Sequence, residues 1–393
     1  MDEMKKEHQK LHIAVFPWLA FGHFLPFLRL SNHLAQLGHR ISFISTPKNL
    51  HRLSQIAPNL SSLVTMVPLP LPPVHGLPDS VESTSELPFR LVPYLKRAYD
   101  QLQPPLTEFL QNSDVNWLIH DFVPHWLPQV ASRLGINSVF FSIFNASVLA
   151  FLGSPEEILL RDQQPLEDLT VVPEWIPFPS NVAFRLYEVI YHQECMDSDA
   201  SDFFRFAKVI EGCRFVAIRS CPEFEGRELG LVKTMAGQEN RKLRPLRCTR
   251  FRSSGFWSWF SLGRLGSTKA DHGPSINRWF LNPLWMEFCD RGSGSGRVLI
   301  LFPGACSDQG LMARLLAGKQ VGLEIPRNEK DGSFTSDSVS ESIRRVMVEK
   351  EGEQLKRNAW AMKEIFGNVQ LQNKYLDEFT RVLESELVLT KST

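Results

Sequence analysis

The chain lacks an excess of charge of either sign. Its 393 residues include 43 Lys and Arg against 43 Asp and Glu, which gives a formal net charge of +0 at pH 7. A balanced chain has no long-range field that would attract a nucleic acid or an acidic membrane surface, so we expect neither as a partner. Hydrophobic residues make up 43% of the chain, which is typical of a globular protein with a large core.

Long apolar segments are also missing. The N-terminal stretch MDEMKKEHQK is polar and contains no apolar region of the kind found in signal peptides. The longest apolar run, residues 139–152, is interrupted by Ser142, Asn145 and Ser147 and is too short to span a bilayer. We therefore expect a cytoplasmic protein without a membrane span.

Paired cysteines and clustered metal ligands are absent as well. The cysteines are scattered and show no C-x-x-C spacing, so we expect free thiols in a reducing compartment. His120, Asp121 and His125 lie close together in the sequence, but successive residues of a strand point to opposite faces. We expect no metal ion at this position.

What the chain does contain is an alternation of strand and helix patterns. The short apolar run 11–16 predicts a buried strand, and helical spacing follows over 24–37 until Gly38 ends it. The same criteria predict strands at 40–45, 64–69, 117–120, 139–143, 215–219 and 298–302, and helices at 91–103 (interrupted at Pro104 and Pro105), 126–134, 310–316, 336–349, 354–366 and 371–387. This rhythm indicates right-handed βαβ units and an open parallel sheet.

Two polar residues follow predicted strands at the positions where open α/β sheets bind ligands. His23 comes after the first strand, in PWLAFGHFLP, and Asp121 comes after the strand at 117–120, in WLIHDFVPHW. If these strands are neighbours, the carboxylate can bind one imidazole nitrogen and leave the other to take a proton from a hydroxyl. Their positions in the sequence also fit two ordinary loop residues, so a catalytic pair and a pair of loop residues both remain possible interpretations.

Several aromatic residues fall near these two polar positions. An apolar wall for a bulky acceptor could come from Phe16, Trp18, Phe21, Phe144 and Phe151, although ordinary core packing is the alternative. A nicotinamide-dependent oxidoreductase is a third possibility for such a sheet. It is disfavoured because no G-x-G-x-x-G motif follows the first strand.

Four stretches of the chain have a recognisable pattern. They are HIAVFPWLAFGHFLPFLRLSNHLAQLGHRISFIST, WLIHDFVPHWLPQVASRLGI, IRSCPEFEG and GRVLILFPGACSDQGLMARLLAGKQVGLEIPRNEKDGSF. Together they resemble plant family-1 UDP-glycosyltransferases, and the likeness is greatest to the branch that adds sugars to flavonoid or terpenoid glycosides. The resemblance covers residues 11–229 and resumes at about Gly296.

This resemblance implies an α/β fold of two Rossmann-like domains facing each other across a cleft, the GT-B type. It implies an inverting hexosyltransferase that moves glucose or rhamnose from a UDP-sugar to a hydroxyl of a flavonoid or terpenoid glycoside. By position in the family, His23 is the general base, Asp121 orients it, and Asp308 and Gln309 contact the donor sugar. We expect a monomer that uses the UDP-sugar as co-substrate, binds a small-molecule acceptor and needs no cofactor or metal.

Only the last residues of the family's donor-binding signature are present in this sequence. The signature begins with Trp-Ala-Pro-Gln, includes His-Cys-Gly-Trp and closes with Asp-Gln, which is present here as Asp308 and Gln309. With permitted codons, a one-base shift of residues 278–292 reads Gly-Gly-Phe-Leu-Thr-His-Cys-Gly-Trp-Ser-Ser-Val-Ile-Glu. The same shift of residues 265–276 reads Trp-Ala-Pro-Gln followed by His-Pro-Ser-Ile, and residues 234–254 can be read as the family's preceding strand and loop.

Three matches in the right order and with the same offset predict a reading frame lost near Leu231 and regained near Gly296. We therefore divide the chain into an acceptor-binding Rossmann-like domain (1–229), an out-of-frame or disordered segment (230–296) and the remnant of a UDP-sugar-binding domain with a returning C-terminal helix (297–393). The C-terminal domain is thus expected to be incomplete. The alternative to an active transferase is a catalytically inactive degenerate homologue or a defective gene model that lacks donor binding.

Overall fold

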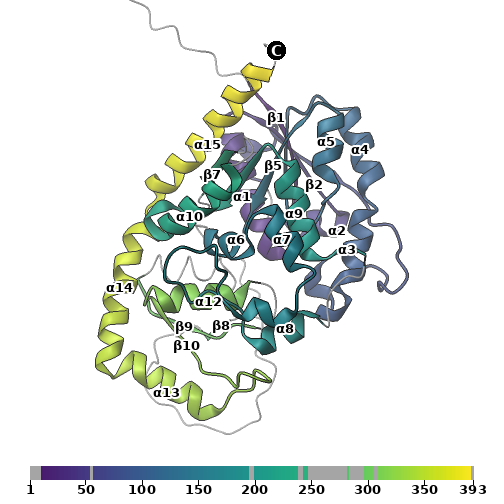
Figure 1. The fold of residues 1–393 in the computed structure, drawn as a ribbon. Coiled ribbons are helices and arrows are strands. Elements are labelled where there is room, and N and C mark those ends of the chain that lie inside the picture. The colour runs from purple at the N-terminus through teal and green to yellow at the C-terminus, as the bar shows by residue number, and fades with distance from the viewer. Residues whose placement is uncertain are drawn as a thin grey trace, which may run out of the picture.

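The computed structural model describes residues 10–53, 56–193, 199–237, 242–246, 281–282, 296–304 and 308–390. Within this part of the chain, none of the helices combines the length and apolar character needed to cross a membrane. The described residues form two α/β units, each built on a parallel sheet (Figure 1).

The N-terminal unit contains a seven-stranded sheet in the order β3-β2-β1-β4-β5-β6-β7. Its strands are β1 (His12–Phe16), β2 (Arg40–Ser45), β3 (Val64–Pro68), β4 (Trp117–His120), β5 (Asn137–Ser142), β6 (Phe215–Arg219) and β7 (Lys242–Leu246). All neighbouring pairs are parallel. The order of the strands reverses between β1 and β4, and ligands of open α/β sheets bind at such a reversal, beyond the carboxyl ends of the strands.

Helices connect these strands and cover the sheet. They are α1 (Phe21–Gln36), α2 (Pro47–Arg52), α3 (Val92–Asp100), α4 (Gln103–Gln111), α5 (Leu127–Arg133), α6 (Ala146–Leu152), α7 (Pro155–Arg161), α8 (Leu186–Gln193), α9 (Asp202–Gly212) and α10 (Pro222–Gly237). The interruption expected at Pro104 and Pro105 lies slightly earlier, because both prolines belong to the first turn of α4. Proline fits there since the first N–H groups of a helix have no partner within the helix.

The C-terminal unit has a smaller parallel sheet in the order β10-β9-β8. It consists of β8 (Leu281–Asn282), β9 (Leu299–Leu301) and β10 (Gly322–Glu324), with the helices α12 (Gln309–Gly318), α13 (Ser336–Met347) and α14 (Lys350–Phe366). Its own small core is formed by Ile300, Ile325, Val346 and Leu355.

The last helix, α15 (Val369–Thr390), leaves the C-terminal unit and packs on the large sheet. Figure 1 shows it in yellow, running past α10 and β7. The indole Nε1 of Trp117 in β4 donates a hydrogen bond to the carbonyl oxygen of Leu383 at 3.1 Å. Arg214, just before β6, forms an ion pair with Glu386 at 2.6 Å. The helix therefore joins the end of the chain to the N-terminal unit.

The segment predicted to be out of frame, 230–296, is described only in part. The end of α10, strand β7 and strand β8 fall within it. The ranges 265–276 and 278–280 and the residues after β8, whose shifted translation resembles the donor motif, lie outside the described residues. The frame change stays a prediction.

Candidate active site

His23 is placed by the turn that follows β1. The strand ends at Phe16, and α1 begins at Phe21 with Ala20 as its N-cap residue. The backbone N–H of His23 donates to the carbonyl oxygen of Ala20 at 2.9 Å, so the imidazole projects from the first turn of α1. Its side chain is 11% exposed.

Asp121 is placed by the strand next to β1. Strands β1 and β4 are parallel with Phe16 opposite His120, so Asp121 is the first residue beyond the pair. Its backbone N–H donates to the carbonyl oxygen of Phe16 at 3.3 Å. The residue is fully buried, yet it lies beside the turn that leads to His23.

The two side chains meet at the reversal point of the sheet. Nδ1 of His23 lies 2.6 Å from Oδ2 of Asp121. The same oxygen accepts the backbone N–H of Trp18 at 3.0 Å, and Oδ1 accepts that of Phe122 at 2.8 Å. Burying a carboxylate is costly unless hydrogen-bond donors surround it, and here three donors point at one carboxylate.

This geometry determines which imidazole nitrogen can act as a base. A carboxylate only accepts hydrogen bonds, so Nδ1 of His23 must have the proton in the contact with Asp121. The lone pair of a neutral imidazole then resides on Nε2. The arrangement can remove a proton from a hydroxyl at Nε2 and stabilise the imidazolium through Asp121.

Of the aromatic residues predicted to bind an acceptor, Phe144 lies beside the base. Its ring centroid is 5.9 Å from that of His23, in an edge-on arrangement. The ring of Trp18 packs edge-on against that of Tyr99, with the centroids 5.2 Å apart. The backbone N–H of Trp18 donates to the carboxylate of Asp121. Phe21 packs against Phe24 at 5.8 Å. Their role in acceptor binding stays a prediction.

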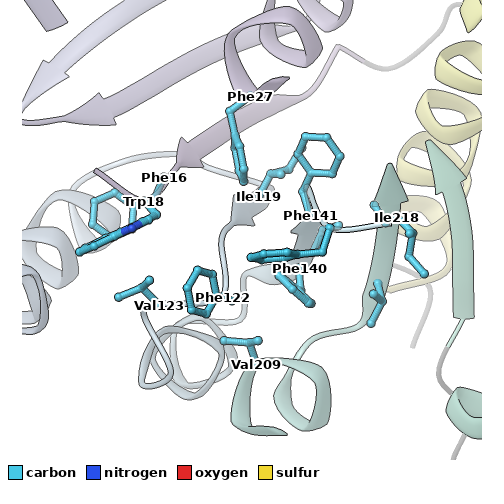
Figure 2. Packing of buried hydrophobic residues seen from close by; sticks show 14 of the residues in the cluster. Phe16, Trp18, Phe27, Ile119, Phe122, Val123, Phe140, Phe141, Val209 and Ile218 are labelled. Carbon is cyan, nitrogen blue, oxygen red and sulfur yellow. The ribbon is translucent and has the colours of Figure 1, made fainter. Parts of the chain in front are cut away.

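The rings around the base belong to a continuous aromatic cluster. Phe122 stacks on Phe206 of α9 at 4.6 Å, and Phe144 contacts both of these rings. Figure 2 shows Phe16, Trp18 and Phe122 gathered at this end of the sheet. The imidazole therefore lies against apolar side chains, which keep water away from one side of it.

Asp308 and Gln309 lie at the start of α12 in the C-terminal unit. Asp308 is the N-cap residue, and the buried Gln309 accepts the backbone N–H of Gly304 through Oε1 at 2.9 Å. The helix reaches the N-terminal unit farther along, because Met312 Sδ lies 3.7 Å from Nδ2 of Asn145. Since Asn145 follows β5, α12 packs near the same edge of the large sheet. The contact of Asp308 and Gln309 with a sugar stays a prediction.

His120 and His125, considered above as metal ligands beside Asp121, face other groups. Nδ1 of His120 donates to the carbonyl oxygen of Asp121 at 2.8 Å, and complete burial lowers the pKa of His120 to about 4. Nδ1 of His125 lies 3.2 Å from the guanidinium of Arg205. Among the residues that the structure describes, no group of three or more potential metal ligands comes together.

The sequence did not indicate several polar residues that make long-range contacts in the folded chain. They are the buried Tyr99, Glu188, Arg205, Glu225 and Arg314, and the partly exposed Asp100. Each one finds its partner far away along the chain, so residue spacing contains no signal for it. Glu225, for example, accepts hydrogen bonds from the backbone N–H and the hydroxyl of Ser147 at 2.9 and 2.7 Å.

Comparison with known proteins places this arrangement in context. No protein-family model matches the chain. It is 37% identical over 453 residues to UDP-glycosyltransferase 91C1 of Arabidopsis thaliana, with 97% of this chain and 98% of that protein covered. It is 28% identical over 459 residues to the soyasaponin III rhamnosyltransferase of Glycine max, with 97% of each covered.

Solved structures agree with the sequence relatives. UGT89C1 of Arabidopsis thaliana, complexed with UDP-L-rhamnose, matches with a TM-score of 0.66 and 18% identity over 95% of this chain and 99% of that chain. The same protein in complex with quercetin matches with a TM-score of 0.65 and 17% identity over 95% and 100%. The fold is thus the two-domain α/β fold of GT-B glycosyltransferases, as the sequence predicted.

The chain belongs to the plant UDP-glycosyltransferases. The family predicted from the sequence is confirmed, and with it the class of enzyme, a glycosyltransferase that uses UDP-sugars. The alignment with the Arabidopsis relative spans 453 positions whereas the chain has 393 residues. That relative therefore contains residues for which this chain has no counterpart.

Proposed function

We propose that the protein transfers a hexose from a UDP-sugar to a hydroxyl group of a glycosylated plant metabolite, with inversion at the anomeric carbon. The observation that supports this most strongly is the 2.6 Å contact between His23 Nδ1 and Asp121 Oδ2 at the reversal point of the sheet. In the proposed reaction this pair is the oriented general base, at the crevice where open α/β sheets bind ligands.

The proposed reaction is a single displacement. Nε2 of His23 takes the proton from the acceptor hydroxyl, and the oxygen attacks the anomeric carbon from the side opposite to UDP. The bond between this carbon and the diphosphate oxygen breaks, UDP leaves, and the configuration inverts. Asp121, fixed by Trp18 and Phe122, stabilises the imidazolium as it forms. No metal or cofactor takes part in this step.

The nature of the substrates is supported by the relatives and by the aromatic cluster. The name of the soybean relative specifies rhamnosyl transfer, and the Arabidopsis structural neighbour was solved with UDP-L-rhamnose and with quercetin. We propose glucose or rhamnose as the donor sugar, with these relatives supporting rhamnose, and a flavonoid or terpenoid glycoside as the acceptor. Phe144 and Phe122 beside His23 suit an acceptor with a flat or bulky apolar body.

Donor binding decides between this proposal and its alternative. Of the family signature, the chain as written has only Asp308 and Gln309, and the alignment leaves positions of the relative unmatched. These observations favour, as the second candidate, a catalytically inactive homologue or a defective gene model that lacks donor binding. In that case the N-terminal unit and its His23–Asp121 pair are intact, but no sugar is delivered.

Two measurements separate the candidates. The purified chain is given UDP-glucose or UDP-rhamnose with a flavonoid glycoside, and UDP release is followed alongside UDP binding by titration calorimetry. Release that disappears in His23→Ala supports the transferase, whereas neither release nor UDP binding supports the inactive homologue. Sequencing the transcript across codons 225 to 300 then shows whether the donor motif is present in another frame.

A further inference from the structure

The end of α3 contacts both loops that hold the proposed base and its partner. Its last two residues are Tyr99 and Asp100. Tyr99 faces the turn between β1 and α1, which leads to His23, and Asp100 faces the loop between β4 and α5, which begins with Asp121. Neither residue touches His23 or Asp121 directly through a hydrogen bond that the structure shows.

Tyr99 contacts three consecutive residues, the last residue of β1 and the first two of the turn that follows it. Its ring stacks on Phe16 with centroids 4.7 Å apart and planes within 9°, and it meets the ring of Trp18 edge-on at 5.2 Å. Its hydroxyl donates to the carbonyl oxygen of Pro17 at 3.0 Å. The backbone N–H that Asp121 accepts from this loop belongs to Trp18, the next residue. Tyr99 therefore fixes the turn that supplies one of the donors to Asp121.

Tyr99 is suited to act as a permanent donor. The side chain is completely buried, and burial, with a further contribution from the negative charge of Asp121, raises its pKa well above the usual value of 10.0. The phenol is therefore neutral and protonated at neutral pH. Its hydrogen bond to Pro17 is not lost by ionisation.

Asp100 holds the second loop through a buried arginine. Its two carboxylate oxygens accept from the guanidinium of Arg205 at 2.9 and 2.6 Å, and Oδ1 also accepts the indole N–H of Trp126 at 3.1 Å. The side chain of Arg205 is 0% exposed, and its Nη1 also donates to the carbonyl oxygen of Val123 at 2.7 Å. Val123 lies two residues after Asp121, so the ion pair fixes the backbone on the far side of the carboxylate.

We propose that Tyr99 and Asp100 are positioning residues that hold the β1–α1 turn and the β4–α5 loop in register with each other. The relative position of His23 and Asp121 depends on this register, because the two side chains come from different loops and touch through a single hydrogen bond. The reaction step that depends on this register is the proton transfer from the acceptor hydroxyl to His23, so the catalytic consequence rests on the proposed function. The structural claim itself concerns the His23–Asp121 hydrogen bond and does not need turnover.

The test reads this hydrogen bond directly. A proton held between an imidazole nitrogen and a buried carboxylate at short distance gives a far-downfield proton resonance, which Asp121→Asn removes and thereby assigns. The resonance is compared in the wild-type chain, in Tyr99→Phe and in Asp100→Asn. Tyr94→Phe is the matched control, because it removes a hydroxyl from the same helix at a ring that packs against Gly76 and Arg97.

We expect the resonance to move upfield or to broaden in Tyr99→Phe and Asp100→Asn, and to stay unchanged in Tyr94→Phe. If the chain turns over, kcat falls by about tenfold to a hundredfold in the first two variants, while the KM for the UDP-sugar is unchanged. A thermal melt confirms that each variant is folded, and if Asp100→Asn does not fold, Tyr99→Phe alone decides.

A resonance that is identical in the wild-type chain and in Tyr99→Phe overturns the proposal. A wild-type chain without the resonance overturns it too, together with the proposed base. If the resonance responds as expected but the chain neither binds nor releases UDP, the positioning role stands and only the proposed function fails.

Discussion

Arg314 of α12 and Glu188 of α8 form an ion pair that is almost completely removed from solvent, with side chains 7% and 2% exposed. The guanidinium also binds Glu324 of β10 at 2.9 Å and donates through Nε to the carbonyl oxygen of Ala183 at 2.9 Å. One arginine thus ties the C-terminal unit to α8 and to the segment before it. The helix that begins at Gln309 is held against the N-terminal unit partly through this pair.

The first prediction concerns the stability that depends on this pair. Arg314→Ala leaves the carboxylate of Glu188 buried without its partner, which costs about 3–5 kcal/mol. The loss is measured as the change in the free energy of unfolding in urea. Arg344→Ala is the control, because that arginine pairs with Glu341 on the exposed face of α13 and should change the stability little. Equal losses in both variants contradict the prediction.

The second prediction concerns the neutral buried His120. Its pKa is about 4 in the folded chain and 6.5 in the unfolded one, so the unfolded state takes up the proton first as the pH falls. The contribution of neutral His120 to the free energy of unfolding is therefore fully present above pH 6.5 and is lost as the pH falls from 6.5 to about 4. Between roughly pH 7 and pH 5 the loss is about 2 kcal/mol.

His120→Asn isolates this contribution, since an asparagine amide can still donate to the carbonyl oxygen of Asp121 but does not titrate. Urea unfolding of both proteins at about pH 7 and about pH 5 shows whether the variant loses less stability on acidification. If both proteins lose the same amount, His120 is not the group that titrates.

The third prediction concerns Glu225 of α10, whose carboxylate accepts hydrogen bonds at the N-terminus of α6. Burial raises its pKa, while hydrogen bonds from Ser220 and Ser147 oppose this shift. Glu225→Ala leaves the hydroxyl and the backbone N–H of Ser147 without an acceptor, at a cost of about 3 kcal/mol or more. Glu225→Gln keeps an amide oxygen as acceptor and should cost less.

The raised pKa of Glu225 also gives the comparison a pH dependence. A carboxyl group that binds its proton more tightly in the folded state contributes stability at low pH, and this is lost as the pH rises through its raised pKa. The free energy of unfolding of the wild-type chain should therefore fall relative to that of Glu225→Gln as the pH increases above about 4.5. A difference in the free energy of unfolding that grows in favour of the wild-type chain as the pH rises contradicts the raised pKa of Glu225.

The fourth prediction concerns the partner of the base. Asp121→Asn keeps the shape of the side chain but permits the wrong imidazole tautomer of His23, so kcat should fall by about a hundredfold to ten-thousandfold. The control is Asp114→Asn at the opposite end of the sheet, where the carboxylate contacts His12 at 2.6 Å and is largely exposed. Its UDP-release rate should match that of the wild-type chain. A similar loss in both variants would remove the special role of Asp121.

Much of the large sheet could be predicted from the sequence because its strands are short apolar runs followed by helical periodicity. The start of β1 and the end of α1 just before Gly38 are such features, and Gly38 has a positive φ of 92°. Helix α6 was not predicted, since all of its residues are buried and its sequence has no polar face to reveal a helical period. Strand β7 lies in a basic stretch without alternation.

The same contrast holds for the candidate site. His23 and Asp121 could be brought together in advance, because both follow strands whose carboxyl ends share one edge of the sheet. Asp308 and Gln309 depended on the family resemblance. Tyr99 and Arg205 could not be predicted, because each binds a backbone carbonyl group of a distant loop, and any residue type supplies a carbonyl. The carboxylate that pairs with Arg205 belongs to Asp100, which lies 105 residues away in the sequence.

The measurement that tests the central claim most directly compares acceptors of different acidity. Transfer to an aliphatic hydroxyl needs a base, whereas transfer to a strongly acidic phenol that is already ionised does not. Rates of UDP release are measured for the wild-type chain and for His23→Ala with both acceptors. The account predicts a loss of about a hundredfold or more with the aliphatic hydroxyl and a much smaller loss with the acidic phenol. Equal losses with both acceptors would contradict the role of His23 as the base.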